Sequence, residues 1–483
     1  MRIASTIRPL ASGLAKLAVQ AAALSCALAV VAALPVAAQD TSFALSERLF
    51  QTISYRMTRD DVPGVVVVVL EDGSPVWTRA FGLSDPRTGR AMTEDALFRV
   101  ESISKPVTAW GAMRVAETGR LDLDAPVTDC LAGWRPPGGL PPITARQLLS
   151  HTAGIGLGDY TERYPPNGPR PDLWTHLAED FTMIAPPDTR FSYSDTGFNL
   201  LELTIETCSG EDFATLMARE VLAPLGMESA SFDWPEAEMP VAHDLRGRPV
   251  APYVYPGRAS GGLHATADDI ARFAAAGMAG AAQDVLSEGA VAEMHRPIVE
   301  VGELFGFAAG GYGLGHFTET LSDGRAALWH GGQGYGWMSH LHMVPESGDG
   351  IVILSNSQRA WPLFAAILRD WSDSLGVAPV GMARVLWAET AAQVAIVMLW
   401  IATGITAWMA VRRVGPRRRF VRISVAGISA ALVLWPLWAA AQDYLFLFSI
   451  LPGLWSWLGI ASAAAGLGLA WAAFKPVHRA RPE

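Results

Sequence analysis

Three apolar segments near the C-terminus constrain the fold of this 483-residue chain more than any other feature. They span residues 391–411, 423–441 and 445–474. Because about 20 consecutive apolar residues let a helix cross the hydrocarbon core of a bilayer, each segment predicts a transmembrane helix. We therefore expect an all-α membrane region at 387–475, with the lipid bilayer as a partner. The third segment contains Pro452, so we expect it to tilt, kink or begin at the membrane interface.

The basic residues beside these segments predict the direction in which the chain crosses the membrane. Six arginines fall in or next to the connector between the first two segments: Arg412, Arg413, Arg417, Arg418, Arg419 and Arg422. The tail at 476–483 carries further arginines. Because basic loops stay in the cytoplasm, we predict a cytoplasmic C-terminus. The part of the chain before 387 should then lie on the periplasmic or extracellular side of the plasma (inner) membrane.

Residues 1–38 have the pattern of a cleavable secretory signal peptide. Basic residues precede an apolar run, and small residues stand before a cleavage site after Ala38. An uncleaved N-terminal membrane helix is the alternative. A signal peptide would export the residues that follow it, in agreement with the arginine cluster. We expect an exported domain at 39–378 and a linker at 379–386.

The composition argues against several classes of protein. Half of the residues (50%) are hydrophobic and 17% are charged, which argues against a disordered chain. Acidic residues (47) outnumber basic ones (37), and their excess lies in the exported domain, which argues against a nucleic-acid partner. Two cysteines of the exported domain, Cys130 and Cys208, either form a disulfide or remain as buried thiols.

The exported domain shows strand patterns at both of its ends and helical patterns between them. Residues 65–70 and 75–82 predict one hairpin, and residues 339–344 and 351–355 predict a second. Helical stretches are expected at 105–118, 144–150, 198–208, 213–221, 266–276 and 361–374. This order predicts an α+β fold in which both ends of the domain build one antiparallel sheet, with flanking helices and a helical insert.

Lys105 is the only lysine of the exported domain, although the domain uses arginine freely. Lysine can lose its proton when its surroundings lower its pKa, whereas arginine cannot. Ser102 lies three residues earlier, so on a helix its hydroxyl would share a face with the amine. An amine next to a serine can activate it as a nucleophile. A surface lysine one turn after a capping serine is the alternative.

Two further motifs follow this pair in the order of a known family. Tyr193-Ser194-Asp195 precedes a predicted helix, and His330-Gly331-Gly332 precedes the second hairpin. With Ser102 and Lys105 as S-x-x-K, the chain resembles the serine β-lactamase and penicillin-binding-protein superfamily over about 45–375. The resemblance is closest to the branch of class C β-lactamases, D,D-carboxypeptidases and esterases. It implies a β-lactamase-like fold.

The resemblance implies acyl transfer through a serine acyl-enzyme. Ser102 is then the nucleophile, and Lys105 and Tyr193 share the proton transfers. The backbone N–H groups of Ser102 and Gln333 would form the oxyanion hole. The family needs no metal and no cofactor for this reaction.

Two positions depart from the pattern of the family. Asp195 stands where an asparagine is usual, and it could keep Lys105 protonated, leaving Tyr193 as the base, or attract a substrate amine. His330 stands where β-lactamases carry a lysine, and a mostly neutral imidazole binds a carboxylate less well. With Gly331 and Gly332, these residues form the predicted substrate-binding set. The departures favour peptide, amide or ester substrates over β-lactams.

Two alternatives to this interpretation remain open. A catalytically silent sensor or binding domain could keep the fold and signal through the membrane helices, although the complete set of Ser102, Lys105 and Tyr193 favours an enzyme. His340 and His342 alternate on a predicted strand and share a face, so they could bind a metal. Because no third ligand is evident, we interpret them as packing residues.

Overall fold

The computed structural model describes residues 39–134, 141–159, 161–302, 305–412, 419–442 and 446–474. The predicted signal peptide, most of the arginine-rich connector and the C-terminal tail lie outside these residues. The chain divides into two compact units, Met1–Leu49 and Phe50–Glu483. The second unit contains the sheet, the candidate site and the apolar C-terminal helices.

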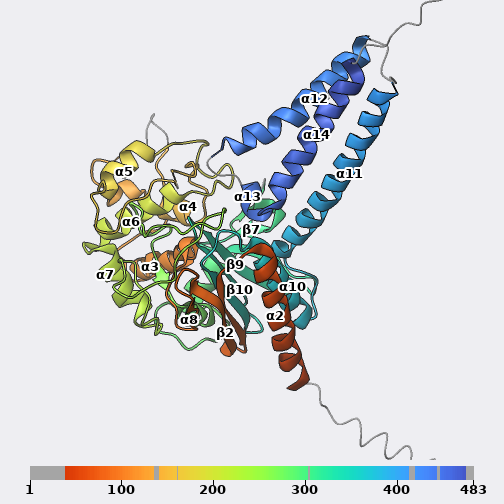
Figure 1. Cartoon of the computed structure of the whole chain (residues 1–483). Helices are drawn as coiled ribbons and strands as arrows, with labels where there is room; N and C mark the ends of the chain where they lie inside the picture. The colour runs from red at the N-terminus through yellow and green to blue at the C-terminus, as the bar shows by residue number, and fades with distance from the viewer. Residues whose placement is uncertain are drawn as a thin grey trace, which may run out of the picture. The chain divides into compact units, whose positions relative to one another are not determined.

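A nine-stranded antiparallel sheet has the order β3-β2-β1-β11-β10-β9-β8-β7-β6 (Figure 1). Its strands are β1 (Gly64–Glu71), β2 (Ser74–Asp85), β3 (Arg90–Ala91), β6 (Val299–Glu300), β7 (Gly311–Tyr312), β8 (Phe317–Thr320), β9 (Ala326–Gln333), β10 (Met338–Val344) and β11 (Asp349–Ser355). Both predicted hairpins are present as β1–β2 and β10–β11. Val65 of β1 pairs with Ser355 of β11, so the two ends of the domain build one sheet, which confirms the predicted fold class. A separate pair joins β4 (Phe98–Arg99) to β5 (His264–Ala265).

Helices cover both faces of the central strands, which explains the unbroken valine run of β1. Nine helices of the described residues precede the membrane segments: α2 (Gln39–Asp60), α3 (Ser104–Glu117), α4 (Ala145–Leu149), α5 (Leu173–Asp180), α6 (Asp195–Ser209), α7 (Phe213–Met217), α8 (Ala267–Ala276), α9 (Glu288–His295) and α10 (Trp361–Ser374). α8 packs on one face of β1, β10 and β11. On the other face, the ring of Trp371 in α10 lies 5.2 Å from that of His342. Strands buried on both faces are apolar throughout instead of alternating.

Several helices of the helical insert start immediately after N-capping residues. α4 and α8 start after Thr144 and Thr266, each of which forms a capping box. α6 starts at Asp195, three residues before the predicted start, because the hydroxyl of Ser194 accepts a hydrogen bond from the Gly197 N–H. This cap sets the chain direction immediately after Tyr193.

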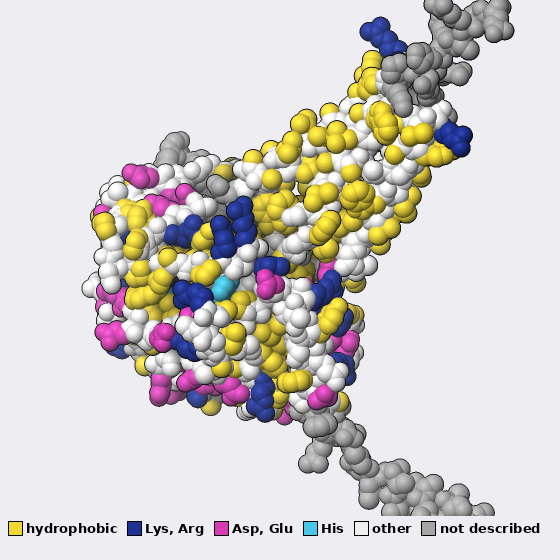
Figure 2. All heavy atoms as spheres, viewed as in Figure 1, with side chains coloured by type: hydrophobic (Ala, Val, Ile, Leu, Met, Phe, Trp, Pro, Cys, Tyr) yellow, Lys and Arg dark blue, Asp and Glu magenta, His cyan; other side chains and the backbone are white. Residues whose placement is uncertain are grey.

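Three helices are long and apolar enough to cross a membrane: Gly381–Val411, Arg419–Ala440 and Leu454–Phe474. In the first of these, a single turn at Gly381–Arg384, inside the predicted linker, continues into α11 (Val385–Val411). α12 (Arg419–Ala440) and α11 both pack against α14 (Leu454–Phe474). The third predicted segment is divided, because Gly453 adopts a left-handed φ of 78° between the short α13 (Phe446–Ile450) and α14. Hydrophobic side chains dominate the surface of these helices in Figure 2.

A buried ion pair joins α2 to the first apolar helix. The guanidinium of Arg56 lies 3.0 Å from the Glu389 carboxylate and 3.5 Å from that of Asp60, and all three side chains are less than 10% exposed. Arg59 also pairs with Glu389. Removing one partner of a buried pair typically costs about 3–5 kcal/mol, because the other charge is left without compensation. The pair therefore ties the start of α11 to α2.

Cys130 and Cys208 are bonded to each other, which answers the question that the sequence left open. Their Cα atoms lie 5.2 Å apart, and they are 78 positions apart in the chain. Closing so long a loop in the unfolded chain is worth roughly 4 kcal/mol in the chain-entropy account. The bond fastens the start of the helical insert to the end of α6.

Candidate active site

Ser102 and Lys105 lie side by side where a short 3₁₀ turn at Glu101–Ile103 runs into α3. The Lys105 ammonium nitrogen is 3.1 Å from the Ser102 hydroxyl oxygen. The lysine side chain is fully buried, and burial in a low-dielectric site penalises its charged form. The helical spacing of the two residues thus produces the neighbouring hydroxyl and amine that the motif requires.

Asp195 is the group that opposes the effect of burial on Lys105. Its carboxylate accepts a hydrogen bond of 2.5 Å from Lys105 Nζ, which also donates to the Ser260 carbonyl at 2.8 Å. Burial lowers the pKa of Lys105 from 10.5, whereas the charge and hydrogen bond of Asp195 raise it. The structure thus places the Asp195 carboxylate against Lys105, a contact that fits the first of the two roles left open by the sequence.

Tyr193 approaches the same pair from the loop before α6. Its ring centre lies 4.9 Å from Lys105 Nζ. Burial and the nearby Asp195 carboxylate hold the pKa of Tyr193 well above 10, and a hydrogen bond with Ser102 acts in the opposite direction. The tyrosine is therefore a neutral phenol at neutral pH, suited to carry a proton between Ser102 and a leaving group.

His151 fixes the loop that carries Tyr193. Its ring centre is 4.4 Å from that of Tyr193, and its Nδ1 accepts a hydrogen bond from the Ser194 N–H at 3.2 Å. Burial and the positive Lys105 hold the pKa of His151 well below its usual range, so the imidazole stays neutral. We interpret His151 as a positioning residue.

Strand β9 carries the His330-Gly331-Gly332 motif and Gln333. Gly331 and Gln333 line the cavity above Ser102. The His330 side chain is fully buried, and its Nε2 lies 3.3 Å from the Tyr312 hydroxyl. A Cβ on Gly332 would lie 2.2 Å from the Ser339 hydroxyl, so only glycine fits there. The substrate-facing surface of this motif is thus its backbone, with the imidazole packed behind it.

Glu101 is a member of the site that the sequence patterns did not reveal. It has a left-handed φ of 51° immediately before Ser102, a conformation that non-glycine residues rarely adopt. Its carboxylate accepts hydrogen bonds from the Arg99 guanidinium at 3.1 Å and the Tyr253 hydroxyl at 2.8 Å. Tyr255 donates a further bond of 3.2 Å. These contacts stabilise the strained backbone of Glu101 immediately before Ser102. In the sequence, the only sign of this role is a charged residue next to the S-x-x-K motif.

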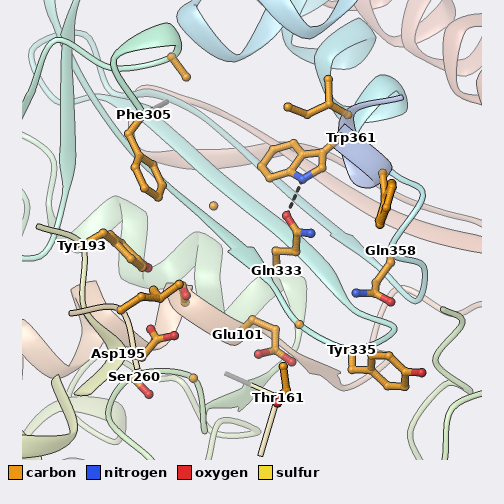
Figure 3. A pocket seen from close by; sticks show the side chains of 18 of the residues that line it. Glu101, Thr161, Tyr193, Asp195, Ser260, Phe305, Gln333, Tyr335, Gln358 and Trp361 are labelled. Carbon is orange, nitrogen blue, oxygen red and sulfur yellow. Dashed lines mark hydrogen bonds between the residues drawn. The ribbon is translucent and has the colours of Figure 1, made fainter. Parts of the chain in front are cut away.

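Ser102, Tyr193, Asp195, Gly331 and Gln333 line one large cavity of about 1330 Å³ (Figure 3). Tyr193, Asp195 and Ser260 lie together on one side of the view, and Gln333 and Trp361 lie across from them, joined by a 2.8 Å hydrogen bond. His340 and His342 lie elsewhere, buried in the sheet between the rings of Trp329 and Trp371. Their contacts fit packing residues. The cavity therefore brings the Ser102 hydroxyl, the Tyr193 phenol and the edge of strand β9 around one space.

Replacing Asp195 with asparagine should shift the ascending limb of the kcat/KM–pH profile to lower pH. The carboxylate raises the pKa of both Lys105 and Tyr193, so its neutral replacement lowers both, whichever of them is the base. Activity depends on a deprotonated base and would begin at a more acidic pH. Stopped-flow or steady-state assays of an ester across pH 4–10 measure this limb. An unchanged limb, or a shift to higher pH, would contradict the role given to Asp195.

Comparison with known proteins places this geometry in context. A family profile described as "Beta-lactamase" matches residues 49–370. Penicillin-binding protein 4 of Amycolatopsis lactamdurans is 29% identical, over 65% of this chain and 86% of that protein. Esterase EstB of Burkholderia gladioli is 27% identical, over 67% and 93%. The octameric penicillin-binding protein homologue from Pyrococcus abyssi has a similar structure, with a TM-score of 0.61 and 26% identity, over 69% and 78%.

Proposed function

Since the chain belongs to the beta-lactamase family and is a serine hydrolase of that fold, we propose that it is a membrane-anchored enzyme acting outside the cytoplasm through an acyl-enzyme on Ser102. The observation that carries the proposal is the contact of Ser102 with a fully buried lysine. Lys105 Nζ lies 3.1 Å from the serine hydroxyl at the base of the cavity. A buried ammonium costs free energy, and catalysis is a reason to keep it.

In the proposed reaction, Ser102 Oγ attacks the carbonyl carbon of the substrate. The serine proton passes to the deprotonated member of the Lys105–Tyr193 pair, and the negative charge develops on the carbonyl oxygen. The backbone N–H groups of Ser102 and Gln333 are the proposed donors to that oxygen. The pair then returns the proton to the leaving nitrogen or oxygen as the bond breaks. Water attacks the acyl-enzyme with the same proton transfers and releases the acid.

The proposed substrates are peptide, amide or ester carbonyls. The penicillin-binding-protein and esterase relatives support both kinds of leaving group. Burial holds the pKa of His330 well below its usual range, so this position supplies no positive charge for a substrate carboxylate. Strong hydrolysis of β-lactams, which carry such a carboxylate, is therefore not favoured by the site.

The membrane part of the proposal rests on the three apolar helices. α11 directly follows the catalytic domain and is the first proposed membrane crossing. α12 and α14 are the second and third. The predicted signal peptide and arginine-rich connector support an exported domain and a cytoplasmic C-terminus. The bonded Cys130 and Cys208 also fit an oxidising compartment.

A fluorescent alkyl fluorophosphonate tests the proposal on the full-length chain in membranes. We expect one covalent adduct, and peptide mass spectrometry should place it on Ser102 and not on the buried neighbour Ser104. Prior heat denaturation should abolish the labelling, since reactivity depends on the folded site. A folded protein that stays unlabelled would instead indicate a silent binding domain.

A further inference from the structure

We propose that the substrate is a membrane-resident amphiphile, whose apolar chain lies against the ends of the membrane helices while its ester or amide carbonyl reaches Ser102. This inference rests on the proposed hydrolase function and adds the class of its substrate. It predicts that the bilayer, and not the surrounding solution, delivers the molecule to the site.

The wall of the active-site cavity carries the first observation. The same cavity that exposes Ser102 and Tyr193 is lined by residues from all three apolar helices and from α13. These residues include Val385 of α11, Ala440 of α12, Phe448 of α13 and Trp455 of α14. The rings of Phe448 and Trp455 lie 4.5 Å apart and form an aromatic part of the wall. A catalytic domain that used only water-soluble substrates would not need this apolar wall.

A direct hydrogen bond connects the membrane segment with the catalytic strand edge. Gln333 donates from Nε2 to the buried Ser449 hydroxyl of α13 at 2.6 Å, and its Oε1 accepts from the Trp361 indole at 2.8 Å. The backbone of Gln333 is the proposed second donor of the oxyanion hole. Only the side chain of Gln333 therefore separates α13 from the proposed oxyanion hole.

The exposed tryptophans indicate the depth of this wall in the bilayer. Trp387, Trp438 and Trp457 are 65%, 59% and 58% exposed, and all three lie at the ends of the apolar helices that line the cavity. Tryptophan prefers the headgroup level of a membrane. Trp455 lies two residues before Trp457, so the apolar cavity wall is at the same level. Ester and amide linkages of membrane amphiphiles also lie at that depth.

Another part of the cavity wall is polar and charged. Loops of the catalytic domain contribute Asp159, Thr161, Arg163, Arg246 and Arg248 to it. The Arg163 guanidinium lies 3.6 Å from the centre of the Tyr335 ring, and both residues line the cavity. In Figure 2, basic side chains gather next to the hydrophobic surface of the helices. An amphiphile matches both walls, with its polar head among these loops and its chain on the aromatic side.

The test uses the full-length protein in phosphatidylcholine vesicles and two esters with the same leaving group. 4-Methylumbelliferyl palmitate partitions into the bilayer, whereas the acetate stays in water. We expect wild-type kcat/KM to be at least about tenfold higher for the palmitate, the scale of a buried apolar contact with the chain. Phe448→Ala and Trp455→Ala should each lower the palmitate-to-acetate ratio about tenfold.

The matched control is Trp457→Ala, which removes an exposed indole from the same helix without changing the cavity wall. It should leave the ratio unchanged. Equal rates on both esters, or a ratio that survives both wall substitutions, would overturn the substrate class while phosphonate labelling of Ser102 still supported a hydrolase. Failure of both the labelling and the ester assays would instead overturn the proposed function itself.

Discussion

Replacing Ser102 with alanine is expected to lower kcat by at least about 10⁴-fold, because no other group in the described site can form the covalent bond to the substrate. Ser102 is the hydroxyl that Lys105 contacts at 3.1 Å, and it lines the cavity next to the proposed oxyanion donors. The measurement is hydrolysis of a fluorogenic ester by the full-length protein, together with phosphonate labelling. Both signals should disappear together.

Ser104→Ala is the control for this substitution. Its hydroxyl donates to the Glu101 carbonyl at 2.6 Å and accepts from the Leu263 N–H at 3.0 Å, so its role is structural. Its loss should cost about 1–3 kcal/mol of unfolding free energy and leave the labelling intact. Substantial turnover by folded Ser102→Ala protein would show that another group is the nucleophile.

Replacing Lys105 with methionine is expected to lower kcat/KM by about 10³-fold, the scale of general acid–base catalysis. Methionine fills a similar volume in a fully buried position but accepts no proton. Lys105→Arg should lose as much, because a guanidinium keeps its proton at every working pH. The assay is the same ester hydrolysis, followed across pH with the wild type as reference.

A second variant separates chemistry from stability in this experiment. Lys105→Met leaves the Asp195 carboxylate without the ammonium that it contacts at 2.5 Å, which costs stability. The double variant Lys105→Met/Asp195→Asn removes that charge and should recover the melting temperature but not the activity. If Lys105→Arg retained near wild-type activity, the lysine would supply only charge, and Tyr193 would be the base.

The sheet could be predicted from the sequence because its strongest signals are local. The valine run of β1 and the turn residues after it identify one hairpin, and the strand pattern around Gly348 identifies the other. By contrast, β6 and β7 have two residues each, too few for any periodicity. α2 was not predicted because only tertiary packing distinguishes its mixed pattern from a loop.

The candidate site likewise contains residues that local motifs predict and residues that only long-range contacts bring in. Ser102, Lys105 and Tyr193 form sequence motifs, so their positions could be predicted before the structure. The bond between Glu101 and Tyr253 joins residues 152 positions apart, and no local pattern encodes it. The burial of His330 behind the strand could not be predicted either, since a motif specifies a position along the chain and not the direction of a side chain.

The ion pair between Arg56 and Glu389 limits how this enzyme can be studied in solution. A fragment that ends before α11 would leave the buried guanidinium of Arg56 with Asp60 as its remaining ion-pair partner among the described residues. The same fragment would lose Phe448 and Trp455 from the cavity wall. A fragment cut before α11 would therefore be less stable and catalytically altered, and detergent or nanodisc preparations of the intact polypeptide are the appropriate material.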